Sequence, residues 1–205
     1  MSVKVKICGL TNLEDAHAAV SAGADLLGFI FAEKSPRRMT PEGVAAFVRH
    51  LPLHVLRVGV FVDPPEALVM EAATACGLNL LQFHGTETPE FCAHFGLMSL
   101  KAFRIRDEAS LEALPDYRTD AWLLDTYSEG QMGGTGQTFN WDLAIAAKKF
   151  GRPIFLAGGL TPDNVAAAVR QVDPFAVDVS SGVELSPGRK DHAKVAAFIR
   201  AAKGA

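Results

Sequence analysis

The stretch VKVKICGLTNLEDAHAAVSAGADLLGFIF, residues 3–31, contains the strand–helix–strand pattern from which the fold can be predicted. Apolar runs at 3–8 and 26–31 are continuous enough to be strands buried on both faces, as parallel strands usually are. Residues 13–22 between them are rich in alanine and have helical spacing. Residues 11–14, TNLE, match a capping box that starts this helix. The stretch therefore predicts a βα repeat.

The same alternation continues along the chain. Further apolar runs predict strands at 55–62, 78–83, 97–103, 121–124, 153–157 and 175–179. Helical spacing recurs at 44–50, 67–75, 165–172 and 193–202, with a weaker short helix at 107–114. Four helix starts are predicted where a capping oxygen precedes proline, at Thr40-Pro41-Glu42, Asp63-Pro64-Pro65-Glu66, Thr88-Pro89-Glu90 and Thr161-Pro162-Asp163.

Eight such units in 205 residues leave about 26 residues for each, the size of a minimal βα repeat. Eight parallel strands joined by helices can close into a barrel, so we predict one α/β domain over 1–205, a single-domain (β/α)8 TIM barrel. The alternative is an open doubly wound sheet. Its G-x-G-x-x-G fingerprint is absent after the first predicted strand, where the turn is Cys8-Gly9-Leu10-Thr11.

Composition excludes several classes of protein. Lys and Arg number 20 and Asp and Glu number 23, a net charge of -3 that argues against nucleic-acid binding through bulk positive charge. No signal-peptide pattern begins the chain, and no apolar run approaches the ~20 residues of a membrane span. Three cysteines without zinc spacing indicate reduced thiols in a cytoplasmic protein.

The strongest chemical signal is a predicted phosphate site at the ends of the last two strands. Gly158-Gly159 follow the seventh predicted strand, and Ser180-Ser181-Gly182 follow the eighth. Glycines let backbone amides approach an anion, and this position often binds phosphate in (β/α)8 barrels. The alternative is that these are ordinary turn residues whose glycines only permit a positive φ.

Residues 126–139 form a long connection with no periodic pattern. It contains Gly133, Gly134, Thr135 and Gly136. We predict a lid that excludes water from a reactive intermediate, the alternative being a tolerated flexible loop.

Cys8 and Asp125 each end a predicted strand, on opposite sides of the barrel. A thiol beside a helix start is a candidate for a lowered pKa and for a role as a base, and a carboxyl at the mouth is a candidate acid. Buried cysteines are also common as small hydrophobic residues, and Asp often caps a helix.

Arg37, in the loop after the second strand, is a candidate for binding a second substrate anion, and His84 for contacting substrate. A solvated pair, Arg37 with Arg38, and a packing histidine are the alternatives. The remaining histidines form no set with metal-ligand spacing, so we expect no metal, and Cys76 and Cys92 are expected to pack in the core.

Motifs spread over nearly the whole chain carry a resemblance to a known family. They are Lys6-Ile7-Cys8-Gly9-Leu10-Thr11, Gly28-Phe29-Ile30-Phe31, Ser35-Pro36-Arg37, Val58-Gly59-Val60-Phe61, Gln82-Phe83-His84-Gly85, Leu124-Asp125, Gly133-Gly134-Thr135-Gly136, Ala157-Gly158-Gly159-Leu160, Val177-Asp178-Val179-Ser180-Ser181-Gly182-Val183-Glu184 and Gly188-Arg189-Lys190-Asp191. Together they resemble the phosphoribosylanthranilate isomerase family. Arg38, Asn140 and Phe83 depart from its usual pattern.

The resemblance implies an Amadori rearrangement of N-(5-phosphoribosyl)anthranilate in tryptophan biosynthesis. It implies that Cys8 is the general base and Asp125 the general acid. Arg37 would hold the anthranilate carboxylate and Asp178 a sugar hydroxyl, with no cofactor. The other hypotheses are a different phosphosugar isomerase or epimerase, or a non-catalytic phosphometabolite-binding module. A monomer is favoured over a homodimer because the sequence has no evident apolar patch, and neither nucleic acid nor membrane is expected as a partner.

Overall fold

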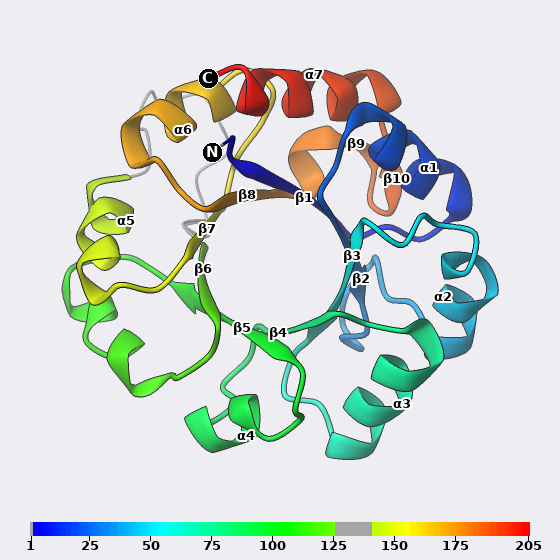
Figure 1. The fold of residues 1–205 in the computed structure, drawn as a ribbon, viewed down its shortest axis with the longest axis horizontal. Helices are drawn as coiled ribbons and strands as arrows, with labels where there is room; N and C mark the ends of the chain where they lie inside the picture. Colours follow the sequence, from blue (N-terminus) through cyan, green and yellow to red (C-terminus); the bar gives the residue numbers. More distant parts are fainter. Residues whose placement is uncertain (1, 126–140) are drawn as a thin grey trace.

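The eight predicted strands form a closed parallel barrel in chain order, which confirms the predicted fold class (Figure 1). The computed structural model describes residues 2–125 and 141–205. The strands are β1 (Lys4–Cys8), β2 (Leu26–Ile30), β3 (Leu56–Phe61), β4 (Leu80–Phe83), β5 (Met98–Arg104), β6 (Ala121–Asp125), β7 (Ile154–Ala157) and β8 (Ala176–Val179). Each begins and ends within two residues of its predicted position, because apolar runs of this kind have no other buried place in the fold.

Seven helices surround the barrel (Figure 1) in the part of the chain that the structure describes. They are α1 (Leu13–Ala22), α2 (Pro41–Val48), α3 (Glu66–Cys76), α4 (Pro89–Ala93), α5 (Trp141–Ala147), α6 (Val165–Val172) and α7 (His192–Lys203). Short 3-10 helices lie at Lys148–Phe150 and Ser181–Val183, and a hairpin of β9 (Glu184–Ser186) and β10 (Arg189–Lys190) follows β8. None of these helices is long and apolar enough to cross a membrane.

The weak helix predicted at 107–114 is wrong. Two 3-10 turns, Ala109–Leu111 and Leu114–Asp116, take its place after β5. Asp107 accepts hydrogen bonds from the amide and the hydroxyl of Ser110, which is a local alternative to a helical turn. Pro115 also disfavours helical geometry at the residue before it, so no longer helix can form across this segment.

Two of the predicted caps are confirmed and two are wrong. Thr40 and Thr88 each accept a backbone amide in the first turn of α2 and α4. Asp63 instead accepts from the Thr86 amide and hydroxyl, and α3 begins without a side-chain cap. Thr161 accepts from the nearby Asp163 amide in a turn, and α6 begins only at Val165. A capping residue before proline therefore marks a turn as often as a helix start here.

The barrel interior is mostly apolar away from the carboxyl ends of its strands. Alternate residues of each strand point inward, as the two-residue period of a strand requires. The inward residues form a separate core cluster of Leu26, Val58, Leu80, Leu100, Ala102, Ala121, Leu123, Phe155, Ala157 and Ala176. The outward residues pack against the helices in a larger core. At the carboxyl ends of the strands the inward-facing side chains are largely polar. This is the end at which a (β/α)8 barrel has its active site.

Asp15 in α1 binds the segment that follows β8. Its carboxylate accepts hydrogen bonds from the Lys190 amide at 2.9 Å and from Asn12 Nδ2 at 2.8 Å, and lies 2.8 Å from His192 Nε2. Asn12, one residue beyond the predicted Thr11, is the actual cap of α1 and accepts from the Asp15 amide. Burial alone would raise the pKa of Asp15, but these hydrogen bonds outweigh it and lower that pKa.

Replacing Asp15 with alanine is expected to lower the free energy of unfolding by about 2 kcal/mol at neutral pH, because buried donors lose their acceptor. Since its pKa is lower in the folded state, this stabilisation is present above the unfolded value of about 3.9 and is lost as the pH falls through the folded value. Urea unfolding at pH 7 and at about pH 3 measures both effects. Glu14→Ala, an exposed neighbour in the same turn, is the control. A loss as small as that of the control would contradict this role.

Candidate active site

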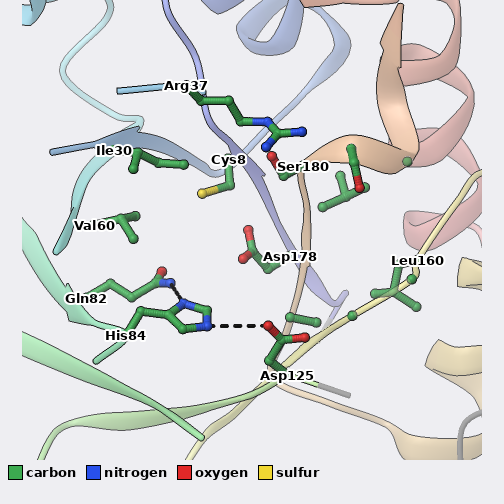
Figure 2. A pocket seen from close by; sticks show the side chains of 16 residues that line it. Cys8, Ile30, Arg37, Val60, Gln82, His84, Asp125, Leu160, Asp178 and Ser180 are labelled. Carbon is green, nitrogen blue, oxygen red and sulfur yellow. Dashed lines mark hydrogen bonds and ion pairs between the residues drawn. The ribbon is translucent and has the colours of Figure 1, made fainter. Parts of the chain in front are cut away.

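A pocket of about 330 Å³ opens at the carboxyl ends of the strands (Figure 2). Ten of the residues singled out in the sequence line it: Cys8, Arg37, His84, Asp125, Gly158, Gly159, Asp178, Ser180, Ser181 and Gly182. The other lining residues include Ile30, Val60, Gln82, Ala157 and Leu160. The predicted lid residues Gly133, Gly134, Thr135 and Gly136 lie outside the described residues.

Cys8 and Asp125 lie on opposite sides of this pocket (Figure 2). Cys8 ends β1 and Asp125 ends β6, and the strands β7 and β8 separate them around the barrel. Each is the last inward-facing residue of its strand, so the barrel presents both side chains to the same space. A molecule bound between them would have a thiol on one side and a carboxyl on the other.

The environment of Cys8 differs from the sequence-based hypothesis of a lowered pKa. The residue is only 5% exposed, and burial raises the pKa of its thiol. The positive charges of Lys6 and Lys190 act in the opposite direction, and the carboxylate of Asp178 acts with burial. The hypothesis was wrong because it considered the nearby helix start and not the loss of solvent around the sulfur.

A chain of hydrogen-bonding groups orients Asp125. Its Oδ2 lies 3.3 Å from His84 Nε2, and His84 Nδ1 lies 3.2 Å from Gln82 Nε2 (Figure 2). His84 therefore lies between Gln82 and Asp125, with one ring nitrogen facing each of them. Gln82, a strand-end residue to which the sequence assigned no role, therefore helps to orient the His84 ring.

Arg37 is fixed by a partner that sequence reasoning missed. Its Nε and Nη2 donate to the two carboxylate oxygens of Glu184 at 2.8 and 2.6 Å. Lys190, which is buried, donates to the same carboxylate at 2.8 Å. Burial alone would raise the pKa of Glu184, but these two cations hold it below its ordinary value. The remaining guanidinium hydrogens of Arg37 can then bind a second anion.

The neighbouring arginine behaves differently. Arg38 lies 4.0 Å from the exposed Glu33, and about half of its side chain is exposed. It does not line the pocket. The solvated-pair alternative thus describes Arg38 but not Arg37, whose side chain is only 18% exposed.

The predicted phosphate residues come together at one end of the pocket. The loops after β7 and β8 both line it, and the short helix Ser181–Val183 begins there. A Cβ on Gly182 would overlap the Leu160 carbonyl oxygen, so only glycine allows the two loops to pack directly against each other. The buried Ser180 Oγ has no hydrogen-bond partner within the described residues. This arrangement of amides and hydroxyl groups fits a phosphate group.

Lys6 is a further polar residue that the sequence did not single out. It is fully buried two residues before Cys8, and its Nζ lies 3.0 Å from Asp178 Oδ1. The two-residue period of β1 was a signal for it, because Lys6 and Cys8 must point to the same side of the strand. Across residues 2–125 and 141–205, no group of three or more His, Cys, Asp or Glu is arranged to hold a metal ion.

Comparison with known proteins gives matches over almost the whole chain. A family model for N-(5'phosphoribosyl)anthranilate (PRA) isomerase matches residues 5–201. An N-(5'-phosphoribosyl)anthranilate isomerase from Geobacter sulfurreducens is 57% identical over 202 residues, which cover 98% of this chain and 99% of the relative. The crystal structure of the phosphoribosyl anthranilate isomerase from Thermotoga maritima has a TM-score of 0.93 and 44% identity, covering 99% of this chain and 100% of that one.

A second crystal structure of such an enzyme is a complex with reduced 1-(o-carboxyphenylamino)-1-deoxyribulose 5-phosphate. It has a TM-score of 0.90 and 42% identity, and covers 99% of this chain and 100% of that one. The ligand of that relative carries a phosphate at one end and a carboxylate at the other.

Proposed function

The chain belongs to the N-(5'-phosphoribosyl)anthranilate isomerase family and is an isomerase of tryptophan biosynthesis, and we propose that Asp125 is its general acid and Cys8 its general base. The reaction is an Amadori rearrangement of N-(5-phosphoribosyl)anthranilate to 1-(2-carboxyphenylamino)-1-deoxyribulose 5-phosphate. The observation that carries the assignment is the placement of a thiol and a carboxyl on opposite sides of one pocket. Arg37 and the glycine–serine loops lie in the same pocket.

Asp125 gives its proton to the ring oxygen of the ribose, which breaks the bond between that oxygen and C1. The electron pair of the substrate nitrogen forms the double bond of a Schiff base at C1. His84, which lies 3.3 Å from the carboxyl, orients Asp125 toward the sugar. A general acid must be protonated when substrate binds and must reach the ring oxygen, and a side chain at the end of β6 meets the second condition.

Cys8 then takes the proton from C2 of the sugar. The electron pair of that C–H bond forms the C1–C2 double bond, and the Schiff-base nitrogen receives the electrons of its former double bond. The resulting enolamine tautomerises to the aminoketone product. A base is needed on the side of the sugar away from the acid, and β1 and β6 provide that separation. We propose that Asp178, between these strands on β8, binds a sugar hydroxyl.

The two anions of the substrate set its orientation. We propose that Gly158, Gly159, Ser180, Ser181 and Gly182 bind the phosphate through backbone amides and hydroxyl groups. Arg37 would bind the anthranilate carboxylate with the guanidinium hydrogens that Glu184 leaves free. With both ends held, the reacting C1 and C2 atoms lie between Asp125 and Cys8.

Replacing Arg37 with alanine is expected to weaken binding of reduced 1-(o-carboxyphenylamino)-1-deoxyribulose 5-phosphate by about 10- to 100-fold, the effect of losing one charge-assisted hydrogen-bonded pair. Affinity for ribose 5-phosphate, which lacks the carboxylate, should change little. Calorimetry on the purified variant measures both constants. Arg38→Ala is the matched control, because the neighbouring arginine does not line the pocket. Equal weakening for both ligands would contradict a carboxylate-binding role.

The proposed activity is tested directly with the purified full chain. Phosphoribosylanthranilate is fluorescent, and its consumption is followed by the loss of that fluorescence. Turnover that depends on intact protein and gives the aminoketone product would support the proposal. No turnover by folded protein at saturating substrate would contradict it.

We further propose that residues 1–205 act as one catalytic domain, as a monomer in the cytoplasm, with only the small-molecule substrate as partner. The three free thiols Cys8, Cys76 and Cys92, all buried, suit a reducing compartment. Light scattering of the purified protein measures the oligomeric state. A stable dimer at micromolar concentration would overturn the monomer.

A further inference from the structure

Lys6 is a lysine enclosed in the barrel directly below the pocket. Its side chain is fully buried, whereas the inward-facing positions around it are mostly apolar. The register of β1 places Lys6 opposite Asp178 on β8, and places Cys8 opposite Gly28 on β2. A buried ammonium is costly unless it is paired, and Lys6 Nζ lies 3.0 Å from Asp178 Oδ1. An apolar residue in place of Lys6 would avoid the free-energy cost of burying an ammonium. The charge of Lys6 therefore indicates a role other than packing.

Gly28 on β2 lies beside both the Lys6 ammonium and the Cys8 sulfur. A Cβ built on Gly28 would lie 2.8 Å from Cys8 Sγ and 3.1 Å from Lys6 Nζ. The sulfur and the ammonium therefore border the same small space, which any side chain on β2 would fill. Because β2 has a glycine at this position, the Lys6 ammonium can interact with Cys8 as well as with Asp178.

We propose that Lys6 is a positioning residue for the isomerase reaction, whose buried ammonium stabilises the thiolate of Cys8 and thereby prepares it to accept the C2 proton. This inference rests on the proposed role of Cys8 as the base. During the step the C2 proton moves to the sulfur, and Lys6 keeps its own proton throughout. The ammonium then remains paired with Asp178 alone when Cys8 is a neutral thiol.

The other two cations near Cys8 both pair with one carboxylate. Arg37, from the loop after β2, and Lys190, from β10, both pair with Glu184 on β9. Asp178 on β8 is an anion and opposes a thiolate. Burial also opposes it. Among the residues that the structure describes, Lys6 is thus a cation that borders the same space as the sulfur and is held by Asp178 rather than by Glu184.

The first test is a titration of the thiolate in Lys6→Met. Thiolate absorbs in the ultraviolet, and a scan from about pH 6 to about pH 10 covers the ordinary range of cysteine. Burial raises the pKa of Cys76 to about 11 and of Cys92 to about 12, so these thiols titrate above the scan. Subtracting the Cys8→Ala signal isolates Cys8. We expect the Cys8 thiolate signal at a given pH within the scan to fall by about tenfold or more in Lys6→Met, which corresponds to a rise of the midpoint by about one pH unit or more even where that midpoint lies above the scan.

The matched control is Lys4→Met. Lys4 lies on the same strand and face as Lys6, but about half of its side chain is exposed, and it pairs with Asp25 away from the pocket. Its removal should leave the Cys8 midpoint unchanged. An unchanged midpoint in folded Lys6→Met would overturn the proposal, since a purely structural ion pair predicts lost stability without a shifted titration.

The second test compares kcat/KM of Lys6→Met and wild type across the same pH range. We expect a loss of about tenfold or more at pH values below the wild-type thiolate midpoint, where both thiolate fractions change in parallel, and a smaller loss above that midpoint, where the wild-type thiol is already ionised. A loss that stays the same at pH values above the wild-type midpoint would contradict the proposal. Turnover also separates the two hypotheses. If Cys8→Ala remains active, the proposed base is wrong, whereas the titration still reports whether Lys6 acts on the thiol.

A third variant protects the test from misfolding. Asp178→Asn removes the competing anion and leaves the ammonium of Lys6 to Cys8, so the thiolate midpoint should fall, opposite to the effect of Lys6→Met. If Lys6→Met does not fold, a midpoint that stays or rises in Asp178→Asn would overturn the proposal, because an ammonium released from Asp178 should favour the thiolate.

Discussion

Asp125→Asn is expected to lower kcat by about a thousandfold, within the range attributed to a general acid or base. Asparagine has nearly the same shape and can still accept from His84 Nε2, which lies 3.3 Å from Asp125 Oδ2 in the wild type. It has no proton to give to the ring oxygen. The barrel should therefore remain intact, and ring opening should become limiting. The measurement is steady-state turnover by fluorescence together with thermal unfolding.

Asp173→Asn is the matched control, with the same chemical change at a side chain that is 93% exposed at the far end of α6. Its turnover should equal that of wild type. Binding of the reduced product analogue to Asp125→Asn should be nearly unchanged, because the phosphate loops and Arg37 are untouched. If Asp125→Asn retains kcat within about threefold of wild type, another group supplies the proton.

Cys8→Ala is expected to cause a loss of similar size, about a thousandfold or more in kcat. Alanine leaves a small space beside Gly28 and removes the only group at the end of β1 that can accept a proton. Ring opening by Asp125 does not need the thiol, so the defect should lie in removal of the C2 proton. Substrate deuterated at C2 tests this point, because the isotope effect on kcat should be larger in the variant than in wild type.

Cys92→Ala is the control for loss of a buried thiol. Cys92 is as buried as Cys8 but lies in α4, away from the pocket. It should lose some stability and keep its turnover. Near-normal turnover in Cys8→Ala, with a normal thermal transition, would show that the thiol is a packing residue, the alternative that the sequence left open.

The strands of this protein could be predicted from sequence because each is a short apolar run between polar turns, and such runs have few other stable places. The helix after β5 could not, because a local serine–aspartate turn and a proline at 115 compete with helical hydrogen bonds. The cap at Asp63 failed for a different reason. Its partner, Thr86, lies 23 residues further along the chain and becomes adjacent only after β3 and β4 pair.

The candidate site divides in the same way. Residues at strand ends, such as Cys8 and Asp125, could be singled out because the barrel fold alone tells where they go. Their partners could not. Arg37 and Glu184 are 147 residues apart, and Lys6 and Asp178 are 172 apart, so neither pair leaves a local pattern. The rise in the pKa of Cys8 also required the folded environment, because burial of one sulfur depends on every strand around it.

The pairing of β1 with β8 has a consequence for the order in which the protein becomes active. β8 begins at Ala176, so a ribosome must synthesise most of the chain before β1 can find its second neighbour. Closing so long a loop costs conformational entropy, which is recovered only when the last contacts form. Cys8, the proposed base, therefore lies in a segment that is synthesised before β8, one of the two strands that pair with β1. Catalytic activity should therefore appear in one late step, when β8 pairs with β1. It should not increase gradually as the chain is lengthened.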